Sequence, residues 1–293
     1  MRQGGVRLGR ILGIEVSANP GVLVIGALLA WSLAATVLPS NAPGMVDRSY
    51  WAAGLLGALL FLGSLLAHEL AHSVVARRNG VEVRGITLWM FGGVSEFEED
   101  PASPGADFRI TAAGPATSLA LGGIFLAVSA ACSAAGAQEI YVVLTSWLGL
   151  INLVLGVFNL LPGAPLDGGR LVAVGLWKWH GDRLRGRIGA AKAGRVVGIG
   201  LVGLGIAEMY QFGGFSGLWT ILIGWFLFST ARNELAYYDH LRTLERLATP
   251  PPPPASPPVQ HWVAPSDEPV AAAATPLPPV PAPPVDRVHG TSG

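Results

Sequence analysis

Residues 64–78 read SLLAHELAHSVVARR, so an apolar run that closes on two arginines carries the pattern HELAH at residues 68–72. In a helix, His68 and His72 lie on one face and can bind the same zinc ion. Glu69 lies beside them as a candidate general base. Ionisable groups inside a membrane helix are costly and seldom lack a role, so three of them within one and a half turns indicate a functional site. The structural alternative is a set of side chains that bridge helices by hydrogen bonds.

The composition around this motif is that of a membrane protein. Of the 293 residues, 51% are hydrophobic and 13% are charged, which is far from the balance of a soluble domain. Lys+Arg and Asp+Glu both number 19, so the net charge indicates no nucleic-acid partner and no strongly acidic substrate. The single cysteine, Cys132, has no intramolecular disulfide partner and is interpreted as a small apolar residue in helix packing.

Hydropathy predicts an α-helical polytopic membrane protein with about six transmembrane helices, since each span needs about 20 predominantly apolar residues. The second predicted span contains the HELAH motif. The fifth is short and rich in glycine, so its ends are the least defined. The predicted spans are Gly21 to Leu38, Ala52 to Ala76, Ile110 to Ala131, Ile140 to Leu161, Val196 to Tyr210 and Leu218 to Ala231.

Basic residues define the predicted orientation of these spans. With the N-terminus in the cytosol, Arg48 is the one basic residue of 19 that falls in an outside loop, as the positive-inside rule expects. We therefore expect a multi-pass protein of the cell membrane whose N-terminus and C-terminus are both cytosolic. The basic stretch from Lys178 to Arg195 is interpreted as part of this topology signal, with a patch for lipid headgroups or substrate as the alternative.

The chain divides into four predicted segments. Residues 1–20 are expected to be a cytosolic N-terminal segment, residues 21–235 the transmembrane core and residues 236–248 a short cytosolic helix or linker. Residues 249–293 are rich in proline and alanine, with an uninterrupted proline run at 250–254. Such a composition cannot bury a core, so this last segment is predicted to be a disordered proline-rich cytosolic tail.

A third metal ligand has to come from outside the HELAH motif, because a catalytic zinc usually takes three protein ligands and leaves a fourth position for water. Residues 159–169 read NLLPGAPLDGG, with two prolines and three glycines. They predict an irregular backbone after the fourth span, which survives at membrane depth only where it lines a cavity. Asp167 in this segment is the candidate third ligand. Taken alone, it would be read as a turn residue.

Together, HELAH at residues 68–72 and NLLPGAPLDGGR at residues 159–170 resemble the paired motifs of the site-2 protease family of intramembrane zinc metalloproteases. The likeness extends over approximately residues 10–235 and points to a compact bacterial type that lacks a PDZ domain. It implies one Zn²⁺ per subunit and hydrolysis of peptide bonds in or near transmembrane segments, as in regulated intramembrane proteolysis. By this resemblance the site residues are the zinc ligands His68, His72 and Asp167, the general base Glu69 and, for stabilising the transition state, Asn159.

Residues 81–97 link the second and third spans and are too short and interrupted to cross the membrane. Apolar residues alternate on either side of Arg84-Gly85, and Gly92-Gly93 follows as a turn, so the pattern predicts strand, turn and strand. We expect a short re-entrant β-hairpin beside the zinc, whose free edge pairs with an unwound substrate. A surface linker is the alternative. The candidate substrate-binding residues are Leu88, Met90, Gly92 and Gly93.

Two glycine-containing motifs add to the resemblance. Phe91-Gly92-Gly93 resembles a family loop near the active site, and Gly114-Pro115 resembles the pair that opens the family's next helix. Without the other motifs, each would be read as an ordinary turn or a helix-packing glycine.

The expected partners are the lipid bilayer and a transmembrane protein substrate, for which the resemblance implies an anti-sigma factor or another regulatory membrane protein. Two other functions compete with a protease. One is a transporter or channel that passes metal ions or protons along His68, His72 and Asp167, and the other is a catalytically dead scaffold. Glu69 separates transport from hydrolysis, because a transport site must release its ion, whereas hydrolysis needs a base beside the metal.

Overall fold

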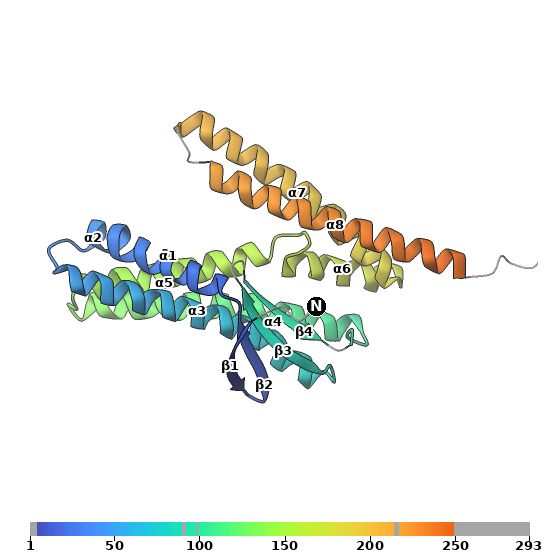
Figure 1. Cartoon of the computed structure of the whole chain (residues 1–293), viewed down its shortest axis with the longest axis horizontal. Coiled ribbons are helices and arrows are strands. Elements are labelled where there is room, and N and C mark those ends of the chain that lie inside the picture. The colour runs from blue at the N-terminus through green and yellow to red at the C-terminus, as the bar shows by residue number, and fades with distance from the viewer. Residues whose placement is uncertain (1–4, 90–91, 98, 214–216, 249–293) are drawn as a thin grey trace, which may run out of the picture. The chain divides into compact units, whose positions relative to one another are not determined.

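The structure is a computed structural model that describes residues 5–89, 92–97, 99–213 and 217–248. The predicted disordered tail at residues 249–293 and the candidate residue Met90 lie outside these ranges. The described chain is mostly helical and carries a small sheet (Figure 1). Its helical segments are α1 (Gly21–Ser32), the π-helical turn η1 (Leu33–Val37), α2 (Leu38–Asn41), α3 (Asp47–Arg78), α4 (Pro104–Ala134), α5 (Glu139–Asn159), α6 (Asp167–His180), α7 (Arg183–Phe212) and α8 (Leu218–Ala248).

Five helical stretches in the described part of the chain are long and apolar enough to cross a membrane. The sixth predicted span forms the first part of α8, which continues without a break through the charged residues that follow Ala231. The sixth crossing therefore stays a prediction. The five stretches are Gly21–Asn41, Asp47–Arg78, Pro104–Ala134, Glu139–Asn159 and Arg183–Phe212.

The helices after residue 159 differ from the prediction. The prolines and glycines of residues 159–169 were expected to prevent a regular helix, but α6 begins at Asp167 and takes in Gly168 and Gly169. The fifth predicted span starts at Val196, whereas α7 starts at Arg183, where the Asp182 side chain accepts a hydrogen bond from the Arg185 N–H and caps the helix. A helix can extend beyond the apolar stretch that crosses a membrane, so the span boundary at Val196 stays a prediction.

The sheet has four strands in the order β1-β2-β3-β4, which are β1 (Val6–Ile11), β2 (Ile14–Ala18), β3 (Val83–Trp89) and β4 (Gly92–Phe97). β3 and β4 form the expected hairpin, but two details of the prediction are wrong. β3 runs through Arg84-Gly85, where the register shifts, and Gly92-Gly93 lie in β4 rather than in a turn. Residues 1–20 also contain a hairpin that was not predicted, and β2 pairs in parallel with β3.

The sheet packs on the helix that carries the HELAH motif. Ile14 of β2 and Ile86 and Leu88 of β3 form a buried cluster with Val22 of α1 and Leu65 of α3. Because Leu65 lies three residues before His68 on the same helix, this cluster holds β3 and β4 beside the motif. The sheet lies next to α3 in Figure 1.

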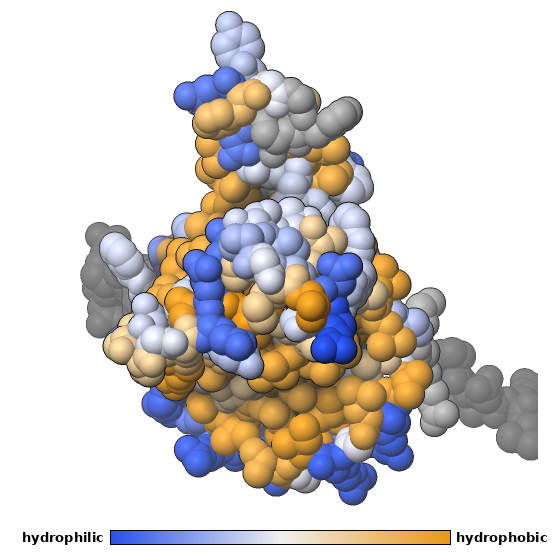
Figure 2. Space-filling view, turned by 90° about the vertical axis from the view of Figure 1, so that its left-hand side faces the viewer, coloured by the Kyte–Doolittle hydropathy of each residue, from blue (hydrophilic) through white to orange (hydrophobic). Residues whose placement is uncertain are grey.

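Large apolar side chains cover the outer faces of the long helices, as expected for helices that contact lipid. Figure 2 shows apolar residues over much of the visible surface, with polar residues gathered in patches. Examples with more than half of their area exposed are Leu23, Trp31, Leu55, Leu59, Val196, Ile199 and Leu204.

Glycines allow α7 and α8 to approach closely along their lengths, in the way that small residues do in membrane helix pairs. A Cβ atom at Gly198 of α7 would lie 2.7 Å from the Phe228 nitrogen and 2.8 Å from the Gly224 oxygen of α8. A Cβ atom at Gly200 would meet nothing within 4 Å. The two glycines therefore differ only in which face of α7 they occupy.

We predict that Gly198→Leu lowers the thermal stability of the purified protein in detergent, because the side chain forces α7 and α8 apart. Overpacking of this kind costs about 1–3 kcal/mol, so the midpoint of thermal unfolding should fall by several degrees. Gly200→Leu is the matched control and should leave the midpoint within about a degree of the wild type. Equal midpoints for the two variants would contradict the close α7–α8 packing.

Candidate metal centre

The HELAH motif lies in α3, and its three ionisable side chains are removed from solvent. The exposed fractions are 3% for His68, 8% for Glu69 and 7% for His72. One helical turn separates the two histidines, so their imidazole rings lie on the same face of α3. Their Nε2 atoms are 3.2 Å apart. The local sequence alone thus brings two nitrogen donors together.

Asp167 reaches the same point from a distant part of the chain. Its Oδ2 lies 3.2 Å from the Nε2 of His68 and 3.3 Å from the Nε2 of His72. The irregular turn before α6 makes this approach possible, because Gly168 and Gly169 pack against its backbone. A Cβ at Gly168 would lie 2.3 Å from the Leu160 and Leu161 oxygens, and one at Gly169 would lie 2.2 Å from the Ala164 nitrogen.

Both imidazole rings are oriented by α4, and this role of α4 was not predicted from the sequence. The Nδ1 of His72 lies 2.7 Å from the Ile110 carbonyl oxygen, which can only accept, so this nitrogen donates and Nε2 keeps its lone pair. The Nδ1 of His68 lies 2.9 Å from the Ser118 Oγ. Partners of this kind fix the tautomer and direction of metal-binding histidines. Gly114-Pro115 on the same helix was the only nearby sequence signal.

The three side chains have the donor set of a zinc site. One ligand atom from each lies within 4.8 Å of the other two, and two imidazole nitrogens with one carboxylate oxygen are a common set for catalytic zinc. The ordinary pKa of an aspartate side chain is about 3.9, far below neutral pH. Asp167 is therefore an anionic donor at neutral pH.

Glu69 lies against the edge strand of the sheet. A Cβ atom at Gly93 of β4 would lie 2.2 Å from the Cγ and 2.6 Å from the Cδ of Glu69, so only glycine fits there. Gly93 was predicted to lie near the substrate, and in the structure it lies against the candidate base. Gly92 is the first residue of the same strand.

The remaining site candidates take different positions. Leu88 is buried, and β3 is hydrogen-bonded to β2 on one side and to β4 on the other, so Leu88 lies on no free edge. Asn159 is the last residue of α5, and its Nδ2 donates to the Leu155 carbonyl oxygen at 2.9 Å, a bond within its own helix. The role implied for Asn159 by resemblance thus remains a prediction.

The chain is similar to known proteins in both sequence and fold. Residues 56–139 and 131–202 match the model of peptidase family M50, and together they cover half of the chain. Rip3 from Mycobacterium tuberculosis is 52% identical over 229 residues, which are 78% of this chain and 58% of Rip3. Zinc metalloprotease MJ0392 from Methanocaldococcus jannaschii is 32% identical over 207 residues, 70% of this chain and 55% of MJ0392. This chain thus spans less than two thirds of either relative.

A solved structure supports the same relationship. The site-2 protease from Methanocaldococcus jannaschii superposes with a TM-score of 0.54 and 28% sequence identity, and the match covers 79% of this chain and 95% of that one. The family match includes the HELAH motif and Asp167, the residues that build the metal centre. The chain therefore belongs to peptidase family M50, the site-2 protease family.

Proposed function

We propose that this chain is a zinc metalloendopeptidase that hydrolyses peptide bonds in or near the transmembrane segments of other membrane proteins. The observation that carries the proposal is the convergence of His68, His72 and Asp167 in a helix assembly with five membrane-capable stretches, with Glu69 beside them. The relative MJ0392 is named as a zinc metalloprotease and the solved neighbour as a site-2 protease, which supports the same reaction class.

Space for a metal ion is kept by Gly114 of α4. A Cβ atom at this position would lie 2.1 Å from the His72 Nε2 and 2.6 Å from the His68 Nε2, so a larger residue would collide with the two nitrogens that would hold the ion. The orienting contacts of α4 lie on the opposite ring nitrogens. α4 therefore contacts the Nδ1 side of both rings, and its Gly114 leaves the Nε2 atoms free of a side-chain clash.

The proposed chemistry assigns a separate task to each residue. Zinc, when bound, supplies a water of lowered pKa and polarises the scissile carbonyl. His68, His72 and Asp167 hold and orient the ion, and Glu69 takes the proton of the attacking water and returns it to the leaving amine. Asn159 donates a hydrogen bond to the developing oxyanion after a change of its side-chain rotamer. A transport site has no need for Glu69, which is why we favour hydrolysis.

The membrane setting of this reaction follows from the distribution of basic residues. We assign the N-terminus and the C-terminus to the cytosol, the membrane core to residues 21–235, the helical extension to residues 236–248 and the proline-rich tail to residues 249–293. The zinc then lies nearer the cytosolic end of α3, because His72 precedes Arg77 by only five residues. Cleavage would release a cytosolic fragment, as in regulated intramembrane proteolysis. An anti-sigma factor or another regulatory membrane protein is the kind of substrate that fits.

The substrate is held, in this proposal, by the outer edge of β4. A transmembrane helix has to unwind before its peptide bonds can be cut, and its freed N–H and C=O groups then need partners. β3 is paired on both sides, so it cannot accept a further strand, whereas β4 ends the sheet and touches Glu69 through Gly93. Strand addition at β4 would place an extended substrate beside the base.

We predict that Glu69→Gln keeps zinc but lowers cleavage by about 10²-fold or more, because the nearly isosteric amide cannot accept the water's proton. Asp167→Ala is the comparison variant and should lose zinc, since two protein ligands remain. Zinc content is measured on purified protein after a mild chelator challenge. Cleavage is measured by comparing the membrane proteomes of cells with wild-type and variant protein, in which an uncleaved single-span substrate should accumulate with the variant. Wild-type processing by Glu69→Gln would remove Glu69 from the role of base, and equal zinc in Asp167→Ala would remove Asp167 from the ligand set.

We predict that Gly114→Ala weakens zinc binding by about tenfold or more, comparable to the loss of a group that orients a ligand, because the added methyl occupies the space in front of both Nε2 atoms. Gly123→Ala on the same helix is the control, since a Cβ there meets nothing within 4 Å. Competition with a zinc chelator of known affinity measures both variants. Wild-type affinity in Gly114→Ala would place the ion elsewhere.

We predict that proline at one of two adjacent positions of β4, Val94 or Ser95, abolishes cleavage without loss of zinc. Successive N–H groups of an antiparallel strand point to opposite sides, so one of the two prolines removes an N–H from the outer edge. Proline at Leu88 would not test the outer edge of β4, because Leu88 lies in β3, which is paired on both sides. Normal cleavage by both Val94→Pro and Ser95→Pro would refute strand addition at β4.

A further inference from the structure

One face of α4 carries a row of residues that contact the other two helices of the metal centre. Ser118 and Gly114 lie against the histidines of α3, and Asp107 lies seven residues before Gly114. Positions 107, 111, 114 and 118 recur at helical spacing, so they share this face. The C-terminal end of this row, at Gly114 and Ser118, therefore contacts the two histidines, and its N-terminal end carries Asp107.

Asp107 is a buried carboxylate with charged partners. Only 5% of its surface is exposed. Its Oδ1 accepts a hydrogen bond from the Arg170 Nε at 2.7 Å and one from the Thr111 hydroxyl at 3.4 Å, and its Oδ2 lies 3.8 Å from the Arg183 Nη2. A buried carboxylate is costly unless it is paired in good geometry, and breaking such a pair leaves an uncompensated charge. The Asp107–Arg170 contact therefore ties α4 firmly to α6.

Arg170 lies one helical turn after Asp167, so both side chains project from the same face of α6. The start of this helix has no side-chain cap, and the residue before it is Leu166. The turn that precedes α6 contains Pro162, Gly163 and Pro165 and is not regular helix. The ion pair between Arg170 and Asp107 thus fixes the start of α6 to α4, one helical turn after the metal ligand Asp167.

We propose that the Asp107–Arg170 ion pair is a positioning element that sets the distance of Asp167 from His68 and His72. α4 acts as the common support, because the same helical face orients the His68 ring through Ser118 and holds α6 through Asp107. The inference rests on the proposed zinc site and deepens it. Neither Asp107 nor Arg170 touches the ion or the substrate, so each acts through Asp167.

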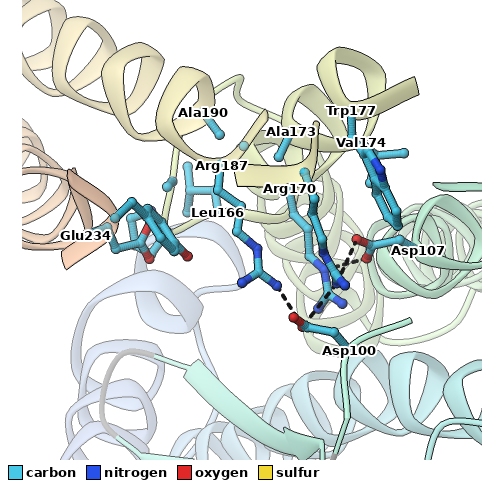
Figure 3. A pocket seen from close by; sticks show the side chains of 15 residues that line it. Asp100, Asp107, Leu166, Arg170, Ala173, Val174, Trp177, Arg187, Ala190 and Glu234 are labelled. Atoms are coloured by element: carbon cyan, nitrogen blue, oxygen red, sulfur yellow. Dashed lines mark hydrogen bonds and ion pairs between the residues drawn. The ribbon is translucent and has the colours of Figure 1, made fainter. Parts of the chain in front are cut away.

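A neighbouring ion-pair set provides the control. Asp107 and Arg170 line a cavity of about 270 Å³ that Asp100, Arg183 and Arg187 also line. Figure 3 shows Arg170 directed at Asp107 and Arg187 directed at Asp100 across this cavity. Asp100 pairs with Arg187 at 2.6 Å and with Arg183 at 3.1 Å. These two ion pairs connect the segment before α4 to α7, and neither includes a residue of α6.

The experiment compares Asp107→Asn, Arg170→Lys, Arg170→Met and Asp100→Asn in the full chain, purified in detergent and loaded with zinc. Zinc affinity is measured by chelator competition. We expect Asp107→Asn and Arg170→Met to bind zinc about tenfold more weakly, as for the loss of groups that support metal ligands. Arg170→Lys keeps the charge and should fall between Arg170→Met and the wild type. Asp100→Asn should match the wild type.

A second readout separates positioning from a general loss of structure. In Asp107→Asn and Arg170→Met all three ligands remain, so added zinc should restore kcat while KM stays unchanged, which a misfolded protein would not allow. Wild-type zinc affinity in Arg170→Met, or an equal loss in Asp100→Asn, would overturn the proposal. A wild-type protein that binds zinc but cleaves nothing would instead overturn the proposed function and leave the positioning result standing. A wild-type protein without zinc affinity would overturn both.

Discussion

Three ligand atoms from two segments that are almost a hundred residues apart in sequence meet beside one another, and the packing of α3, α4 and α6 follows from that requirement. α3 supplies both nitrogens by helical spacing alone. α6 supplies the oxygen because Gly168 and Gly169, at its start, pack closely against the backbone of the irregular turn before it, which lets Asp167 approach the rings. α4 lies against both and contributes no ligand of its own. In an apolar membrane a misplaced polar group is costly, because no water is available there to hydrogen-bond with it.

The part of this site that could be predicted from the sequence is the part that local geometry determines. His68, Glu69 and His72 needed only a helix, and Asp167 needed the motif around it and a family resemblance. Ser118 and the Ile110 carbonyl could not be found in the same way. A serine in an apolar helix and a backbone oxygen have no distinctive pattern, and their roles arise only when α3 and α4 pack together. Asp107 was missed for the same reason, because its partner Arg170 is 63 residues away.

The sheet shows a second limit of sequence reasoning. The β3–β4 hairpin is a local structure with alternating apolar residues, and it was predicted, although with its turn and its glycines misplaced. The β1–β2 hairpin was missed because β1 is exposed along its whole length and shows no buried face. The parallel pairing of β2 with β3 joins residues about 70 positions apart, and no periodicity predicts it. Parallel pairs of this kind need a long crossover, which here consists of α1 to α3.

This unpredicted pairing decides which edge of the sheet remains available near the metal centre. With β2 bound to one side of β3 and β4 to the other, the strand that was first considered for substrate has no open side. β4 is left as the edge strand, and it contacts Glu69 at the position where a side chain would collide with the carboxylate. Gly93 thus lets the strand approach the base. In a bilayer, an unwound peptide has few places to recover its hydrogen bonds, so the proposed strand addition at β4 would hold it beside the base.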